Sequence, residues 1–305
     1  MSSDKEMGSR PVVSLGPHYS FMGLPQDTTT YDAARAVIVP VPYDGTTTFR
    51  AGTREGPRAI LTASRELEPY DEEILAEPYQ AGIATLEELA VTVASPREMV
   101  SRVRRAGEAV LKVGKMPVLL GGEHLLSLGM IQAVVDRFPR VTILHLDAHA
   151  DLKEEYQESA YSNACIMRHV HALAPLTQVG IRSLTREEHA YIREADIPCF
   201  WAHALHDDSS WVDRVVSCLG AEVYISIDLD GLDPSIMPAV GTPEPGGLGW
   251  YEVLRLLRRV AMTRRVVGFD VMELLPIPHQ VAPDFLAARL VYKLIGYIFM
   301  DNRAA

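Results

Sequence analysis

The chain has 305 residues, of which 48% are hydrophobic and 23% charged, a balance typical of a globular enzyme built from one large or two smaller α/β domains. Its formal net charge of −11, from 40 acidic and 29 basic residues, argues against nucleic acid or an anionic membrane as a partner and suits a small cationic ligand. Three scattered cysteines without a C-x-x-C pair, and an N-terminus without an apolar signal core, predict a reduced, cytoplasmic protein.

Residues 1–30 are polar and rich in turn formers, which predicts an N-terminal arm or loop that contacts something else. No later stretch has the composition of a linker, so one domain is predicted over residues 31–305. Short apolar, β-branched runs recur along this domain and are typical of buried strands. The predicted strands are Ala36–Val41, Gly82–Thr85, Pro117–Leu120, Val141–Leu146, Leu176–Ile181, Ile197–Trp201, Val223–Ile227 and Val266–Val271.

Segments of helical length lie between most of these runs. Ser95, Pro96 and Glu98 have the spacing of an N-cap, a first-turn proline and a capping box, and predict a helix to about Gly114. Thr185 opens a second box. Strands that alternate with helices predict an α/β fold whose mainly parallel sheet, of about eight strands, is covered on both faces. Further helices are predicted at Gly249–Thr263 and Asp284–Met300; the apolar run Leu290–Met300 contains Lys293 and is too short to cross a bilayer.

Acids and histidines gather where four predicted strands end. In open α/β sheets ligands bind beyond the carboxyl ends of the strands, so we expect these side chains to meet at one edge. Asp147, His149 and Asp151 alternate along an extended chain and therefore share one side, where their carboxylates repel unless positive charge offsets them. The full set is His124, Asp147, His149, Asp151, Asp228, Asp230 and Glu273.

The six likeliest metal donors in this set are two imidazoles and four carboxylates, without a thiolate. A single catalytic zinc usually takes three protein ligands, so six donors suit two ions better. Oxygen-rich donors with histidine fit Mn²⁺, with Fe, Co, Ni or Zn as substitutes. Each segment alone has another interpretation: a salt-bridged loop for Asp147–Asp151, turn residues for Asp228 and Asp230, and a helix-start hydrogen bond for His124.

Several linked motifs resemble the ureohydrolase family, which includes arginase, agmatinase and guanidinobutyrase, and are closest to the agmatinase branch. The similarity covers about residues 35–300. It is carried by GGEH at Gly121–His124, LDAHAD at Leu146–Asp151, SIDLDGLDP at Ser226–Pro234, GTPEPGGL from Gly241 to Leu248, DVME at Asp270–Glu273, and the upstream segment Pro42–Arg58.

The resemblance implies a three-layer α/β/α sandwich with an eight-stranded parallel sheet, assembled as a homotrimer or homohexamer. It also implies two Mn²⁺ ions per chain. One would be held by His124, Asp147, Asp151 and Asp228, and the other by His149, Asp147, Asp228 and Asp230.

The resemblance implies a reaction as well. A bridging hydroxide would attack the guanidinium carbon of a small cationic guanidino substrate, and Asp151 would pass a proton to the departing amine. Glu273 would anchor the guanidinium through paired hydrogen bonds, although a structural ion pair is the alternative for this residue.

One position departs from the family pattern. Close relatives read Y-S-H-A where this chain has Tyr161-Ser162-Asn163-Ala164, so Asn163 stands in place of a catalytic histidine and cannot titrate near neutral pH. The leading hypothesis is hydrolysis of agmatine or N1-aminopropylagmatine to urea and a polyamine. The alternatives are another amidine, such as guanidinobutyrate or formimidoylglutamate, and a catalytically impaired metal-binding homologue.

Overall fold

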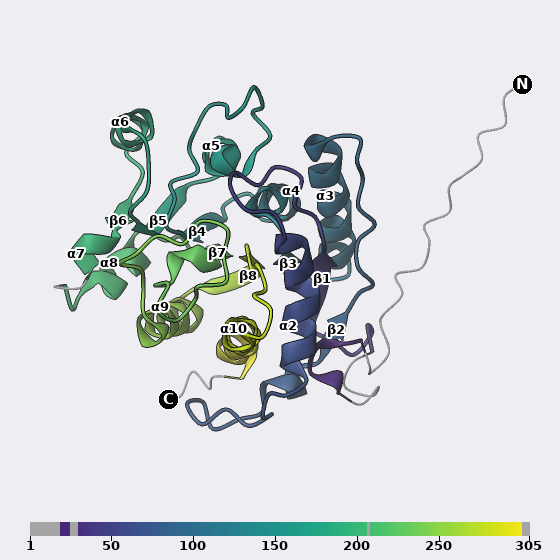
Figure 1. Ribbon diagram of the computed structural model, residues 1–305. Helices are drawn as coiled ribbons and strands as arrows, with labels where there is room; N and C mark the ends of the chain where they lie inside the picture. Colours follow the sequence, from purple (N-terminus) through teal and green to yellow (C-terminus); the bar gives the residue numbers. More distant parts are fainter. Residues whose placement is uncertain (1–18, 25–29, 206–207, 301–305) are drawn as a thin grey trace, which may run out of the picture.

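A single eight-stranded parallel sheet forms the middle layer of the protein (Figure 1). The computed structural model describes residues 19–24, 30–205 and 208–300. The strands are β1 Ala36–Val41, β2 Ile83–Thr85, β3 Met116–Gly121, β4 Thr142–Leu146, β5 Leu176–Ile181, β6 Cys199–Trp201, β7 Glu222–Asp228 and β8 Arg265–Met272. All eight predicted strands are thereby confirmed, with ends that differ by at most two residues.

Helices cover both faces of the sheet and bury two hydrophobic cores. Apolar side chains of α2, α8, α9 and α10 form one core, and those of α3, α4, α5 and α6 form the other. Because both faces are covered, the strands are nearly continuous apolar runs. The helices are α2 Gly56–Ser64, α3 Pro96–Lys112, α4 Ser127–Arg137, α5 Ile166–His171, α6 Arg186–Glu194, α7 Ala202–Leu205, α8 Trp211–Ser217, α9 Trp250–Thr263 and α10 Ala282–Phe299.

Both predicted helix starts lie where the sequence places them. The hydroxyl of Ser95 accepts a hydrogen bond from the Glu98 amide at 3.1 Å and caps α3, while the Glu98 carboxylate pairs with Arg105 instead of completing the box. The box at Thr185 is complete, because its amide donates to Oε2 of Glu188 at 2.8 Å and its hydroxyl accepts from the Glu188 amide at 3.2 Å.

The strand order places the predicted site strands side by side. The order is β2-β1-β3-β8-β7-β4-β5-β6, so β3, β8, β7 and β4, whose ends carry the acids and histidines, are consecutive neighbours at the centre. All run parallel, and their carboxyl ends therefore meet at one edge. The sheet thus brings together segments that lie about 150 residues apart in the chain.

The described part of the predicted N-terminal arm packs into the protein. Phe21 is fully buried and its amide donates to Oγ1 of Thr85 at 3.0 Å, while the amide of Met22 donates to Oγ of Ser64 at 2.8 Å. The rest of the arm, residues 1–18 and 25–29, lies outside the described residues.

The C-terminal helix α10 is buried, as predicted, and its lysine is compensated. Nζ of Lys293 lies 2.9 Å from Oδ2 of Asp71 and 3.1 Å from Oε2 of Glu73, and the Tyr297 hydroxyl donates to the same Glu73 oxygen. These polar contacts fasten the loop before β2 to the helix. Within the described residues, no helix has the length and apolarity needed to cross a membrane.

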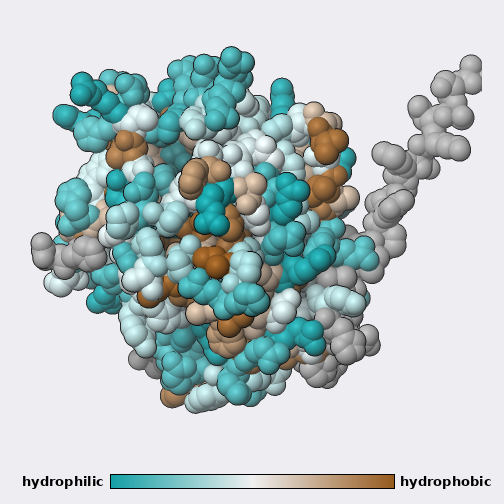
Figure 2. All heavy atoms as spheres, viewed as in Figure 1, coloured by the Kyte–Doolittle hydropathy of each residue, from teal (hydrophilic) through white to brown (hydrophobic). Residues whose placement is uncertain are grey.

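The outer surface is mostly hydrophilic on the face drawn in Figure 2, with small hydrophobic patches near its centre and near its upper right edge. This distribution agrees with the acidic net charge of the chain, −11.

Candidate metal centre

Asp147, the first residue after β4, lies between two histidines. Its Oδ2 is 3.1 Å from Nδ1 of His124, and its Oδ1 is 3.5 Å from Nδ1 of His149. The amide of His149 also donates to Oδ1 at 2.6 Å, so the backbone holds this carboxylate in place. Asp147 is completely buried and is shared by two groups of donors.

The first group surrounds Nδ1 of His124. In addition to Asp147, Oδ2 of Asp228 lies 3.2 Å away and Oδ2 of Asp151 lies 3.4 Å away. Among the described residues none of these oxygens is in hydrogen-bonding geometry with Nδ1, which is buried. Three carboxylate oxygens converge on one ring nitrogen, and that geometry suits a cation placed between them.

The opposite nitrogen of His124 is backed by a hydrogen-bonded chain. Its Nε2 lies 3.0 Å from Oγ of Ser226, whose hydroxyl donates to Oδ1 of Asp270 at 2.9 Å. Because the serine proton is directed to Asp270, Ser226 accepts the proton of Nε2–H. Nδ1 is therefore the nitrogen that can act as a ligand, and its ring is oriented from behind as metal-binding histidines usually are.

The second group surrounds Nδ1 of His149. Oδ2 of Asp230 lies 2.9 Å from this nitrogen, and Oδ1 of Asp230 accepts a hydrogen bond from the Ala148 amide at 3.1 Å. The amide of Asp230 in turn donates to Oδ1 of Asp228 at 2.9 Å. The six predicted donors thus lie in two adjoining groups with Asp147 in contact with both.

Burial dominates the electrostatics of the site. Burial raises the pKa of Asp228 well above its usual value, with Asp230 and Asp147 adding to the shift, and burial likewise raises the pKa values of Asp230 and Asp151. Burial lowers the pKa of His149, but Asp230 and Asp147 outweigh it and raise the pKa to about 12. The site therefore attracts positive charge, and four carboxylates match the charge of two divalent cations.

Glu273 and Asn163 meet beside the donors. Oε1 of Glu273 accepts hydrogen bonds from the His124 amide at 2.7 Å and from Nδ2 of Asn163 at 3.1 Å. Oδ1 of Asn163 accepts from the Leu125 amide at 2.9 Å, so both ends of this amide contact the protein. Glu273 and Asp151 both have left-handed backbone, with φ values of 65° and 52°, a strained conformation that is frequent at functional sites.

A cavity of about 300 Å³ opens onto these residues. Its lining includes His124, His149, Asp151, Asn163, Asp228, Asp230 and Glu273, whereas Asp147 is not among the lining residues. The outer wall carries the exposed Phe49 together with Arg50, Lys153 and Tyr156. The volume suits a small molecule.

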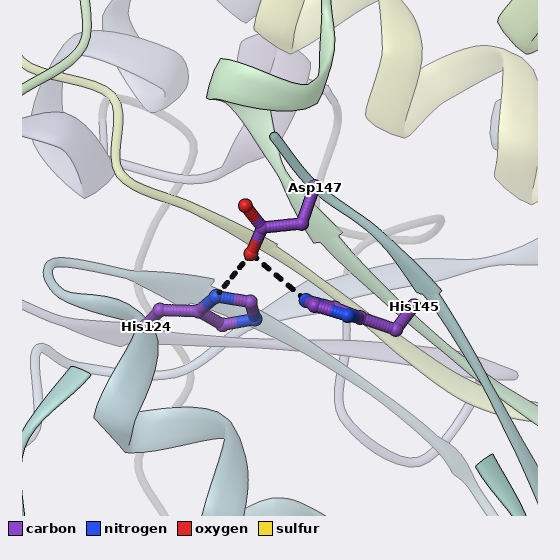
Figure 3. Close-up of side chains that lie close together, drawn as sticks. All are labelled: His124, His145 and Asp147. Atoms are coloured by element: carbon purple, nitrogen blue, oxygen red, sulfur yellow. Dashed lines mark hydrogen bonds and ion pairs between the residues drawn. The ribbon is translucent and has the colours of Figure 1, made fainter. Parts of the chain in front are cut away.

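Sequence reasoning missed His145, which Figure 3 shows with His124 and Asp147. Its Nε2 lies 2.8 Å from Oδ2 of Asp147, and ligand atoms of these three residues lie within 4.8 Å of one another. A signal was present, because His145 lies two residues before Asp147 on the same side of an extended chain. Ser226, which backs His124, had no comparable signal.

Comparison with known proteins shows the family of this chain. The model of the arginase family matches residues 34–296. An N(1)-aminopropylagmatine ureohydrolase from Synechocystis is 40% identical over 277 residues, covering 88% of this chain and 90% of the relative. An agmatinase from Pyrococcus horikoshii is 34% identical over 288 residues, covering 91% of this chain and 98% of the relative.

Solved structures show the same likeness. The agmatine ureohydrolase of Thermoplasma volcanium superimposes with a TM-score of 0.82 at 30% identity, covering 88% of this chain and 92% of that one. The family match, the sequence identity to the relatives and the structural similarity all indicate the same family. The chain therefore belongs to the arginase family, nearest to its agmatinase branch, and is a hydrolase that acts on carbon–nitrogen bonds of linear amidines.

Proposed function

We propose that this chain is a binuclear manganese hydrolase that cleaves agmatine or N1-aminopropylagmatine to urea and a polyamine. One observation supports the proposal most: the two oxygens of Asp147 contact two different histidines, His124 and His149. A carboxylate between two groups of donors is what a pair of divalent ions needs, because a shared ligand can bridge them. The names of the similar proteins support the substrate class.

The proposed ligands divide into two sets that share Asp147 and Asp228. An oxygen-rich set with two imidazoles suits Mn²⁺, and Fe, Co, Ni or Zn are substitutes. When bound, the ions lower the pKa of water and so supply a nucleophile near neutral pH. The first set is His124, Asp147, Asp151 and Asp228, and the second is His149, Asp147, Asp228 and Asp230.

Glu273 is proposed to bind the substrate guanidinium. Its Oε1 already accepts two hydrogen bonds from the protein, so the accepting capacity that remains is on Oε2. This geometry favours one charge-assisted hydrogen bond to Oε2 over the pair that the family resemblance implies. Burial raises the pKa of Glu273 well above its usual value, so a cationic group beside it stabilises the carboxylate form.

Asp151 is proposed to carry a proton to the departing amine. It lines the cavity and its Oδ2 lies 3.4 Å from Nδ1 of His124, so its carboxylate is placed to take up a proton in the cavity and pass it on. Asn163 cannot do so, because an amide does not titrate. Since Asn163 is bound to Leu125 and Glu273, its role is to orient the Glu273 carboxylate.

A second candidate function keeps the metal centre and changes the substrate to guanidinobutyrate or formimidoylglutamate. Arg50 and Lys153 line the cavity and could pair with a substrate carboxylate. However, Nζ of Lys153 lies 3.4 Å from Oε2 of Glu188, which offsets its charge. The polyamine precursors are therefore preferred.

Urea release after reconstitution with manganese tests the proposal. The panel is agmatine, N1-aminopropylagmatine, arginine and guanidinobutyrate, with metal analysis of the same samples. We expect two manganese ions per chain and urea from agmatine or N1-aminopropylagmatine. Formimidoylglutamate, assayed separately, would release formamide instead. Two bound ions without turnover of any amidine would replace the proposal with a catalytically impaired metal-binding homologue.

Three further expectations stay predictions. They are the division into an arm over residues 1–30 and one domain over residues 31–305, assembly into homotrimers or homohexamers, and a cytoplasmic location.

A further inference from the structure

Four buried polar residues form a row across the sheet, one layer below the proposed ligands. Gln178 on β5 is the register partner of His145 on β4, His145 is the partner of Ser226 on β7, and Ser226 is the partner of Asp270 on β8. All four are completely buried. Buried polar groups in the middle of an apolar sheet are costly unless they have a hydrogen-bonding role.

The Ser226 end of this row supports the ring of His124, and the Gln178 end supports His145. Nε2 of Gln178 donates to the carbonyl oxygen of Ala150 at 2.8 Å and lies 3.1 Å from Nδ1 of His145. The carbonyl can only accept, so it determines which end of the amide faces it. With the amide reversed, Oε1 of Gln178 and the carbonyl oxygen of Ala150, both acceptors, would lie about 2.8 Å apart and repel each other.

The orientation of Gln178 determines the proton position on His145. Because Nε2 of Gln178 is a donor, Nδ1 of His145 must accept, and the ring proton resides on Nε2. That nitrogen lies 2.8 Å from Oδ2 of Asp147 and donates to it. Oδ2 is the same oxygen that lies 3.1 Å from Nδ1 of His124 (Figure 3).

This assignment separates His145 from the ligands despite its short distance to them. Neither nitrogen of His145 offers a lone pair to a cation: Nδ1 uses it to accept from Gln178, and Nε2 carries a hydrogen. The ring lies 5.2 Å from the ring of His124, at its side, and does not enter the cavity lining.

We propose that Gln178 and His145 form a relay that positions Asp147, the shared carboxylate of the metal centre, and that His145 is a positioning residue and not a metal ligand. The inference rests on the proposed function for the presence of two ions. Gln178 acts at two points, since it also holds the carbonyl of Ala150 inside the segment Asp147–Asp151. The relay therefore orients both the bridging carboxylate and the loop that carries two other proposed donors, His149 and Asp151.

The test measures manganese affinity and stoichiometry by equilibrium dialysis with elemental analysis on the full chain. His145→Leu removes the donor at similar volume, whereas His145→Gln places an amide donor near the position of Nε2. We expect His145→Leu to weaken manganese binding by about 10- to 100-fold, the usual effect of losing an outer hydrogen bond to a metal ligand. His145→Gln should recover most of this loss.

A double-mutant cycle separates a relay from independent packing effects. Gln178→Met keeps the shape of the side chain and removes its amide, and should weaken binding in the wild-type background. In the His145→Leu background the larger part of that effect, which reaches Asp147 through His145, should disappear, and only the smaller part that comes from the bond to the Ala150 carbonyl should remain. The matched control is Thr177→Val, a buried residue on the same strand that points to the other face of the sheet, which should change affinity by less than about twofold.

Each result is decisive. Wild-type affinity in folded His145→Leu, or equal losses in His145→Leu and His145→Gln with two ions still bound, would overturn the relay. Loss of one ion from both His145 variants would make His145 a ligand and also overturn it. Additive effects of Gln178→Met and His145→Leu on manganese affinity would overturn the coupling between Gln178 and His145. If His145→Leu does not fold, the manganese affinities of His145→Gln and Gln178→Met decide whether the relay exists. Wild-type protein that binds two ions but produces no urea would refute the proposed function and leave the relay intact, whereas wild-type protein that binds no manganese would overturn both.

Discussion

Nδ2 of Asn163 donates to Oε1 of Glu273 at 3.1 Å, and the other end of the same amide accepts from the backbone of Leu125. Asn163 is therefore part of the support of the carboxylate proposed to bind the guanidinium. This relationship makes the role of Asn163 testable separately from proton transfer.

Asn163→Asp should reduce turnover by weakening substrate binding. The new carboxylate keeps the acceptor for Leu125 but places an acceptor against Oε1 of Glu273, so a donor is lost and like charges oppose each other. The loss of a hydrogen bond to a charged group, about 1.5–3 kcal/mol, predicts a fall in kcat/KM of about 10- to 100-fold. Steady-state kinetics with agmatine or N1-aminopropylagmatine measure it, and Asn163→His, which retains a donor, is the matched comparison. An unchanged kcat/KM for Asn163→Asp would show that Asn163 has no role in substrate binding.

Glu273→Gln should leave the metals in place and impair the substrate step. The change is isosteric and removes the negative charge that faces the guanidinium, whereas none of the six proposed ligands is altered. We expect two manganese ions per chain and a kcat/KM reduced by about 10- to 100-fold, the cost of one charge-assisted hydrogen bond. Elemental analysis and urea assays on the same preparation check both parts, and normal kinetics would remove Glu273 from the site.

Asp228→Ala should abolish binding of both ions. Oδ2 of Asp228 lies beside His124 and its Oδ1 accepts from the Asp230 amide, so the residue adjoins both groups of donors. The change also relieves repulsion among buried acids, and the fold should therefore survive it. Metal content by elemental analysis is the measurement, with the exposed Asp136→Ala as control. Two ions retained by Asp228→Ala would show that the ligand assignment is wrong.

Glu73→Gln should destabilise the protein near neutral pH and have a smaller effect in acid. Burial raises the pKa of Glu73, but hydrogen bonds from Tyr297 and Lys293 outweigh it, and the net pKa lies below its usual value of 4.5. A carboxyl group with a depressed folded-state pKa contributes stability that is present above its unfolded pKa and is lost as the pH falls through the folded one.

We therefore expect Glu73→Gln to lower the free energy of unfolding by about 1–2 kcal/mol at pH 7, and the difference from wild type to shrink as the pH falls below about 4.5. Urea unfolding of both proteins across this range measures it, because contributions from the metal centre cancel in the comparison. A difference that does not vary with pH would contradict the assigned contacts.

The strands and the donor types could be predicted from the sequence alone because their signals are local. Apolar runs such as Ala36–Val41 predict buried strands from their own composition, and alternation after Val141–Leu146 places Asp147, His149 and Asp151 on one side. The rule that ligands gather at the carboxyl ends of parallel strands then brought the donors to one edge.

Only the tertiary structure decided which of these groups touch. The strand order places β3, β8, β7 and β4 side by side, and the register of β4 with β5 places Gln178 against His145. Neither can be inferred from the chain, because strand pairing joins residues tens of positions apart, and a shift of one residue would turn every side chain to the other face. The contacts of Asn163 likewise depend on the folding of distant segments. Leu125 lies 38 residues before Asn163 in the sequence, and Glu273 lies 110 residues after it. Residue types and periodicity thus determined what chemistry is available, and long-range packing decided how it is oriented.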